Sequence, residues 1–234
     1  IGEQPMSERI VVINPNSSVD VTAGIDAAMA PLRFADGPSI DCLTLAEGPP
    51  GIECQRHVDG VIGPLCDLIE REGNSADAFV VACFSDPGLH SARETTPHPV
   101  MGISESGITT ALTLGERFGI IAILPAGISR HKRYIRQMGL EGRMAGDRAI
   151  GIGVTGLNAD GATDAVEERM REVGRQLIEE DGADVLIMGC AGMARYRHSL
   201  EDTLGVPVID PSQAAVANAI AAVRLGYSNS TMKA

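Results

Sequence analysis

The sequence predicts an α/β fold made of two pseudo-symmetric lobes, each a mostly parallel sheet flanked by helices. Short apolar runs alternate along the chain with segments that have the apolar spacing of helices. Some runs are apolar at every position, such as FVVA at 79–82 and VLIM at 185–188, which is typical of strands covered on both faces. Three stretches also recur at an offset of about 108 residues, which indicates that one lobe repeats the other.

The apolar runs and the turn residues that end them predict the elements in order. The first strand stops at Asn-Pro-Asn, and a later one stops at Pro125, since proline cannot continue a strand ladder. The predicted strands are 9–13, 40–45, 77–82, 100–103, 117–124, 149–154, 184–188 and 206–209. The predicted helices are 19–30, 58–72, 105–116, a helix after Pro125, 162–181 and 211–225.

Three pairs of matching segments carry the internal repeat. RIVVINPNSS, from residue 9, resembles RFGIIAILPA, from residue 117. ACFSDPG, from residue 82, parallels GCAGM, from residue 189, and HPVMGIS, from residue 98, parallels VPVIDPS, from residue 206. Because the three offsets are nearly equal, two similar lobes explain them better than chance matches between apolar strands.

Composition narrows the class of partner. The 234 residues carry a formal net charge of −12, which disfavours nucleic acid and anionic membrane surfaces. No apolar run approaches the roughly 18–20 residues that cross a bilayer, and the first residues lack the apolar region of a signal peptide. The five cysteines are odd in number and form no CxxC pair, which favours reduced thiols. We therefore expect a cytoplasmic protein that acts on a small molecule, with a homo-oligomer plausible.

Two of the cysteines occupy equivalent places in the repeat. Cys83 and Cys190 each follow a predicted strand, whereas Cys42, Cys54 and Cys66 have no such context and are interpreted as structural. Ligands bind at the carboxyl ends of parallel strands, so two facing lobes would direct both thiols into one cleft. Such a pair suits a reaction in which one thiolate removes a proton from one face of a carbon and the other thiol returns a proton to the opposite face.

The residues after each cysteine predict how the thiolate is stabilised. A free cysteine has a pKa of about 8.5, and nearby N–H groups or a helix N-terminus favour its thiolate form. Asp-Pro-Gly after Cys83 and Ala-Gly-Met after Cys190 are each expected to open a helix close to the sulfur. The same N–H groups are expected to stabilise an enolate oxygen.

At these residues the chain resembles the aspartate/glutamate racemase superfamily, and within it most closely the hydantoin and allantoin racemases. The matching stretches are VVINPNSS, ACFSDPGLHSARE, VMGISES, LIMGCAGM and VPVIDPSQAAV, which span about residues 9–226. The resemblance implies a cofactor-independent racemase whose active site lies in the cleft between two lobes. No metal is expected, because the five histidines do not have the spacing of metal ligands. It also implies that the C-terminal segment returns to the first lobe, which gives 6–99 plus 208–226 for one lobe and 100–207 for the other.

The resemblance implies roles for particular residues. Cys83 and Cys190 match the catalytic acid/base pair, and Asn16 stands where the family places a substrate contact. The residues that would donate to or border a substrate carbonyl are Phe84, Ser85, Ala191 and Gly192.

Departures from the amino-acid racemases predict the substrate. Those enzymes carry polar residues after each cysteine that would hold an ammonium and a carboxylate, whereas this chain has Phe84-Ser85 and Ala191-Gly192. A neutral ring, a 5-substituted hydantoin or allantoin, suits the site better. Close relatives carry two threonines where this chain has Ala122-Ile123, so the exact substrate stays open.

Other functions remain as alternatives. A maleate-isomerase-type cis–trans isomerase also uses two cysteines, and an aspartate or glutamate racemase shares the superfamily. A non-catalytic small-molecule binding protein on the same fold is the alternative from another class. A pyridoxal-phosphate enzyme needs a Schiff-base lysine, and the two lysines lie in a basic helical cluster and at the tail. That cluster, at 130–133, is interpreted as a solvated helix face.

Overall fold

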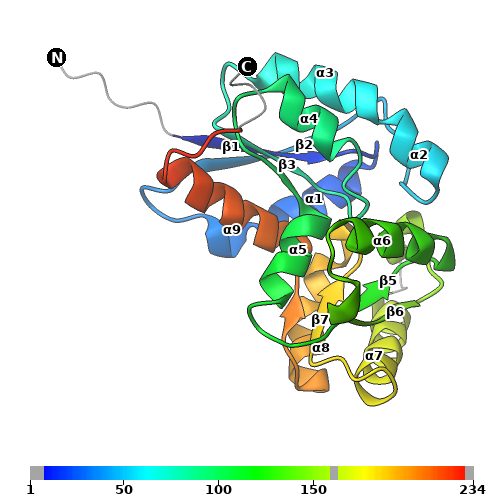
Figure 1. The fold of residues 1–234 in the computed structure, drawn as a ribbon. Helices are drawn as coiled ribbons and strands as arrows, with labels where there is room; N and C mark the ends of the chain where they lie inside the picture. Colours follow the sequence, from blue (N-terminus) through cyan, green and yellow to red (C-terminus); the bar gives the residue numbers. More distant parts are fainter. Residues whose placement is uncertain (1–7, 159–162, 230–234) are drawn as a thin grey trace.

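The computed structural model describes residues 8–158 and 163–229, and it contains two parallel four-stranded sheets (Figure 1). The strand order of the first sheet is β2-β1-β3-β4, and that of the second is β6-β5-β7-β8. The strands of the first are β1 (Arg9–Asn14), β2 (Ser39–Thr44), β3 (Ala78–Val81) and β4 (Val100–Gly102). Those of the second are β5 (Phe118–Ala122), β6 (Met144–Ala149), β7 (Val185–Met188) and β8 (Val208–Ile209).

The second sheet repeats the first in register as well as in order. Ile10 of β1 stands opposite Ala78 of β3, and Phe118 of β5 stands opposite Val185 of β7. Phe118 lies 108 residues after Ile10, which is the offset seen in the sequence. The α/β class with two similar lobes is therefore confirmed.

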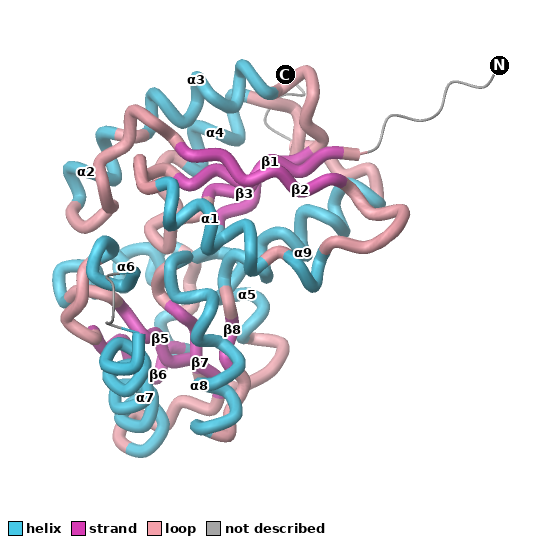
Figure 2. Tube along the Cα trace, turned by 180° about the vertical axis from the view of Figure 1, so that it is seen from behind, coloured by secondary structure: helices cyan, strands magenta, loops and turns pink. Residues whose placement is uncertain are grey.

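Helices cover both faces of each sheet (Figures 1 and 2). On the first sheet, α3 and α4 bury apolar side chains against one face, and α1 and α9 against the other. On the second, α7 and α8 cover one face and α5 and α6 the other. The helices are α1 (Val19–Ala28), α2 (Gln55–Gly60), α3 (Ile62–Glu72), α4 (Leu89–Thr95), α5 (Ile103–Ala111), α6 (Pro125–Gln137), α7 (Thr163–Glu179), α8 (Arg197–Leu204) and α9 (Pro211–Arg224). The short 3-10 turns are η1 (Ala30–Leu32), η2 (Glu141–Arg143), η3 (Val154–Asn158) and η4 (Ala191–Tyr196).

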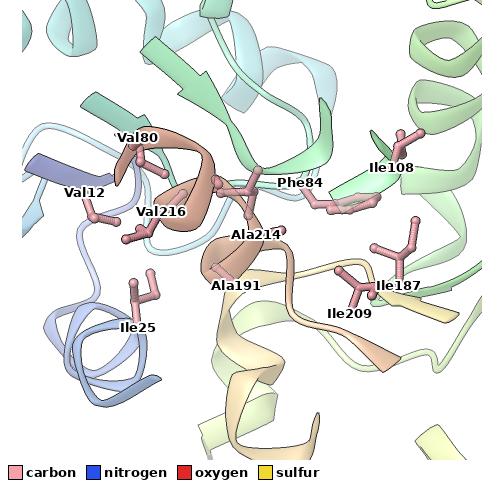
Figure 3. Packing of buried hydrophobic residues seen from close by; sticks show 14 of the residues in the cluster. Val12, Ile25, Val80, Phe84, Ile108, Ile187, Ala191, Ile209, Ala214 and Val216 are labelled. Carbon is pink, nitrogen blue, oxygen red and sulfur yellow. The ribbon is translucent and has the colours of Figure 1, made fainter. Parts of the chain in front are cut away.

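The lobes are joined through α5 and α9, which pack against each other. α5 follows β4 of the first sheet yet contacts β7 and β8 of the second, while α9 follows β8 yet contacts β1, β3 and β4. Gly107 permits the close approach, because a Cβ there would lie 2.9 Å from Cβ of Pro211. One apolar core consequently runs through both lobes, from Val12 to Ile187 (Figure 3).

Two predicted elements were wrong. The helix expected over 58–72 is divided into α2 and α3, because Pro64 has no N–H to donate and its ring conflicts with the carbonyl of Gly60. The strand expected at 149–154 is β6, which ends at Ala149. β6 is a half-buried edge strand with charged residues, so it lacks the apolar run that marks a central strand.

Strand pairing shows where the chain passes from one sheet to the other. β4 belongs to the first sheet and β8 to the second, so the chain crosses between sheets after Gly102 and after Ile209. After β8, α9 packs against β1, β3 and β4 of the first sheet. Residues 6 and 7 of the predicted first lobe, and residue 162 of a predicted helix, lie outside the described residues.

Candidate active site

A cavity lies between the two lobes, where the carboxyl ends of their strands face each other. Both predicted cysteines line it, as do residues of loops and helices from each lobe. Its walls are Asn16, Val21, Ile52, Glu53, Ala82, Cys83, Phe84, Ser85, Ile123, Leu124, Gly127, Arg130, His131, Val154, Gly189, Cys190, Ala191 and Gly192.

The two cysteines begin turns of the same design. The carbonyl of Cys83 accepts from the N–H of Asp86 at 2.9 Å, and that of Cys190 accepts from the N–H of Met193 at 3.1 Å. Each sulfur accepts from the N–H two residues onward, that of Ser85 for Cys83 and that of Gly192 for Cys190. The repeat seen in the sequence therefore places the two thiols in matching backbone settings.

Burial and charge act against each other on these thiols. Burial raises the pKa of Cys83 to about 12, while the Ser85 N–H and the Arg130 guanidinium lower it. Burial likewise raises the pKa of Cys190 to about 11, which the Gly192 N–H lowers and the carboxylates of Glu53 and Asp210 raise. The charge of each sulfur matters to the other, because Cys190 also raises the pKa of Cys83. A proton on one sulfur therefore favours thiolate on its partner.

The expected helix starts occur at only one of the two sulfurs. Cys190 caps η4 directly, but α4 begins at Leu89, after a turn in which Asp86 and Gly88 have positive φ. The local field at Cys83 therefore comes from the Ser85 N–H and from Arg130 rather than from a helix end.

Asn16 is buried on the first-lobe wall and is held by its neighbours. Its side-chain oxygen accepts from Ser18 N at 2.9 Å and from Asn14 Nδ2 at 3.0 Å. The side-chain nitrogen of Asn16, Nδ2, makes no hydrogen bond within the described residues, so it is free to donate to a ligand in the cavity.

Glu53 joins the lobes beside the cavity. Its Oε1 accepts from Val154 N at 2.9 Å, and its carbonyl accepts from Arg130 Nη2 at 3.3 Å. Farther along, Arg133 Nη2 donates to Gln55 Oε1 at 2.8 Å. These contacts hold the 52–55 segment of the first lobe against the second lobe.

All the predicted site residues line this one cavity, whereas other wall residues were missed. Arg130 and His131 belong to the cluster interpreted as a solvated helix face, which was wrong for His131, since it is only 6 % exposed. Its spacing with Gly127 and Ile135, the other buried residues of α6, marks one helix face and was the available signal. Within 8–158 and 163–229, no group of three His, Cys, Asp or Glu residues could hold a metal ion.

The chain matches known proteins along almost its whole length. Residues 10–219 match the Asp/Glu/Hydantoin racemase family. The chain belongs to this family. It is 37% identical to the hydantoin racemase of Paenarthrobacter aurescens over 224 residues, which cover 95% of this chain and 94% of that protein.

Solved structures of allantoin racemases share the fold. The one from Klebsiella pneumoniae has a TM-score of 0.91 and 33% identity, covering 97% of this chain and 92% of its own. The one from Pseudomonas fluorescens has a TM-score of 0.90 and 28% identity, covering 96% of this chain and 94% of its own. The prediction of an isomerase of the racemase class is confirmed.

No helix of the described residues is long and apolar enough to cross a membrane, and all five cysteines are free thiols.

Proposed function

We propose that this racemase inverts C5 of a 5-substituted hydantoin or of allantoin through Cys83 and Cys190, without a cofactor. The observation that supports the proposal is the pair of matching turns that present the two thiols to one cavity from opposite lobes. Two acid/base groups on opposite sides of a carbon are what inversion by proton transfer requires.

The proton balance is simple. The thiolate of one cysteine takes the C5 proton and becomes a thiol, and the electron pair of the C–H bond moves into the ring as an enolate. The thiol of the other cysteine then gives its proton to the opposite face of C5 and becomes the thiolate. The product is the other enantiomer, and the reverse reaction starts from the exchanged protonation state.

Donors around the cavity suit the enolate. The Asn16 amide nitrogen and the Phe84 N–H make no hydrogen bond to any described residue, so both can donate to a substrate oxygen. In other enzymes one such donor is worth about 3–4 kcal/mol in the transition state.

The apolar residues of the cavity wall favour a hydantoin that carries an apolar 5-substituent over allantoin, whose 5-substituent is a polar ureido group. The wall includes Val21, Ile52, Ile123, Leu124 and Val154. Burying an apolar substituent there is favourable by about 25 cal/mol per Å², whereas an unpaired ureido group would lose its hydrogen bonds to water.

The proposal is tested with single enantiomers of 5-benzylhydantoin and of allantoin in heavy water, with a buffer blank for spontaneous exchange. We expect the optical rotation, measured by polarimetry, to fall to zero while deuterium enters C5, as measured by NMR. Both changes should be faster with the hydantoin than with allantoin. Cys83→Ala and Cys190→Ala should each lower racemisation by at least about 100-fold, and each should exchange at most one enantiomer. Full racemisation by either variant, or turnover of maleate without any ring exchange, would overturn the proposal.

A further inference from the structure

His131 is a buried group on the cavity wall that the proton transfer above does not use. It lies on α6 of the second lobe, and its Nδ1 is 2.8 Å from Oδ2 of Asp147 on β6. The His131 side chain is 6 % exposed and that of Asp147 is 0 % exposed. A histidine held by an enclosed carboxylate has a fixed ring orientation.

The contact with Asp147 determines what the other ring nitrogen offers. An ionised carboxylate only accepts hydrogen bonds, so the Nδ1 of a neutral His131 carries the proton and Nε2 is an acceptor. Nε2 makes no hydrogen bond to any residue of 8–158 or 163–229. It is also absent from the fully enclosed polar atoms that lack a partner in those ranges, so it is accessible from the spaces that His131 lines, which include the cavity.

A second contact fixes the ring near the first sulfur. The rings of His131 and Phe84 meet edge to face, with centroids 5.1 Å apart and an interplanar angle of 87°. Phe84 directly follows Cys83 in the chain. A ligand held by His131 would therefore be positioned with respect to that thiol.

The cavity wall carries several donors and few side-chain acceptors besides the thiols and the Ser85 hydroxyl. Asn16 and the backbone N–H groups can donate, and so can Arg130. The side-chain acceptors on the wall include Glu53, whose Oε1 already accepts from Val154 N, and His131, whose Nε2 has no partner among the described residues. A hydantoin ring brings two N–H groups, which need an acceptor when they leave water.

We propose that His131 Nε2 accepts a hydrogen bond from a ring N–H of the substrate, and that Asp147 is the positioning residue that keeps His131 in the accepting tautomer. This inference rests on the proposed function. It makes His131 a specificity determinant for rings with an N–H at the contacted position.

Complementary variants separate the two nitrogens of His131. In His131→Asn the amide nitrogen takes the place of Nδ1 and can still donate to Asp147, but the acceptor is lost. In His131→Gln the amide oxygen stands near the place of Nε2, so the acceptor is kept. Asp147→Asn can donate to Nδ1, which moves the ring proton to Nε2 and turns the acceptor into a donor, as replacement of the buried triad aspartate does in serine proteases.

The substrates are a 5-benzylhydantoin, its N3-methyl derivative, and the oxazolidine-2,4-dione in which oxygen replaces N1–H without added bulk. We expect the wild-type protein to prefer the parent over one analogue by at least about tenfold in kcat/KM. His131→Asn and Asp147→Asn should reduce that preference to about threefold or less, chiefly by raising KM for the parent. His131→Gln should retain more of the preference than His131→Asn, which a merely structural role would not produce.

His90→Asn is the matched control, because His90 is exposed on α4, and it should leave every ratio unchanged. Thermal unfolding of each variant checks that it folds; if His131→Asn does not, Asp147→Asn carries the same comparison. An active variant that keeps the wild-type preference, or loses activity equally on all three rings, would overturn this inference alone. If the wild-type protein racemises none of the rings, the proposed function fails and this inference fails with it.

Discussion

The turns that carry the two cysteines have similar backbone hydrogen bonds, but the helices beside them, α5 and α9, are capped by carboxylates from different places in the chain. After β4, the N-terminus of α5 is capped from a distance by Asp86, whose carboxylate accepts from Ser104 N at 2.9 Å and Glu105 N at 2.8 Å. After β8, the cap of α9 is Asp210 itself, which accepts from Ser212 N at 2.8 Å. The backbone hydrogen bonds at the two cysteines are therefore similar in the two lobes. The carboxylate that caps the following helix comes from the cysteine turn in one case and from the residue before the helix in the other.

Gly102 explains why the cap of α5 comes from elsewhere in the chain. Gly102 matches Asp210 in the repeat, and a Cβ on Gly102 would lie 2.4 Å from Cγ of Asp86. The carboxylate of Asp86 therefore occupies, in the first lobe, the space that the side chain of Asp210 fills in the second. Each lobe has room for one buried carboxylate at this point, and the two lobes supply it differently.

The largest effect on stability is expected from adding a side chain at Gly102, the position where the second lobe has Asp210. Gly102→Ala places a methyl group against Asp86 and should destabilise the protein by about 1–3 kcal/mol, the usual cost of overpacking. The measurement is the free energy of unfolding in urea. Gly24→Ala is the control, because no atom lies within 4 Å of a Cβ there, and alanine should stabilise α1 by up to about 1 kcal/mol. Unchanged stability of Gly102→Ala would show that the carboxylate of Asp86 can move aside for a methyl group, and would contradict the tight fit described above.

An intermediate effect is expected from removing the charge of each cap. Oδ1 of Asp210 accepts from both Ser212 N and Gln213 N, while Oδ2 is buried without a partner in the described chain, so Asp210→Asn keeps its hydrogen bonds. Asp86 uses both oxygens, so Asp86→Asn sets an NH2 group against an N–H and should cost about 1–3 kcal/mol. Equal losses of stability at pH 8, above both raised pKa values, would contradict this difference between the lobes.

The pH dependence of these variants has a definite sign. Burial raises the pKa of Asp86 to about 7 and that of Asp210 to about 6, from an ordinary value of 3.8. A raised pKa favours folding below about pH 4, and that contribution is lost as pH rises through about 6 and 7. The stability of Asp210→Asn relative to the wild-type protein should therefore increase from pH 4 to pH 7, as measured by urea unfolding across that range.

The smallest effect concerns the charges beside the two sulfurs. Arg130 lowers the pKa of Cys83, and Glu53 raises that of Cys190, so the lobes place opposite charges near their thiols. Arg130→Gln should raise the pKa of Cys83 and Glu53→Gln should lower that of Cys190, each by about one unit or less. The readout is the pH dependence of iodoacetamide alkylation, resolved by peptide mass spectrometry. Arg133→Gln is the control, and shifts of the same sign in both test variants would contradict the assignment.

The sequence was sufficient where the signal was local or repeated, and insufficient where it depended on pairing. The position of Cys83 and Cys190 on one cavity could be predicted because the repeat marks both, and the central strands could be predicted because they are apolar throughout. The contact of His131 with Asp147 could not, because it depends on the position of β6, whose residues MAGDRA lack the continuous apolar run of a central strand. The Asp86 cap was hidden for the same reason, since it bridges residues 18 and 19 positions apart.

The crossing of α5 and α9 has a consequence for any attempt to divide the molecule. The helix that follows the last strand of each sheet packs against the other sheet: α5 leaves the first sheet and covers the second, and α9 leaves the second and covers the first. A polypeptide that ended after α5 would contain all four strands of the first sheet, but α5 would lack the second sheet against which it packs. Two such fragments could satisfy each other only by reciprocal exchange, and the binding cleft would then sit on the symmetry axis of a dimer.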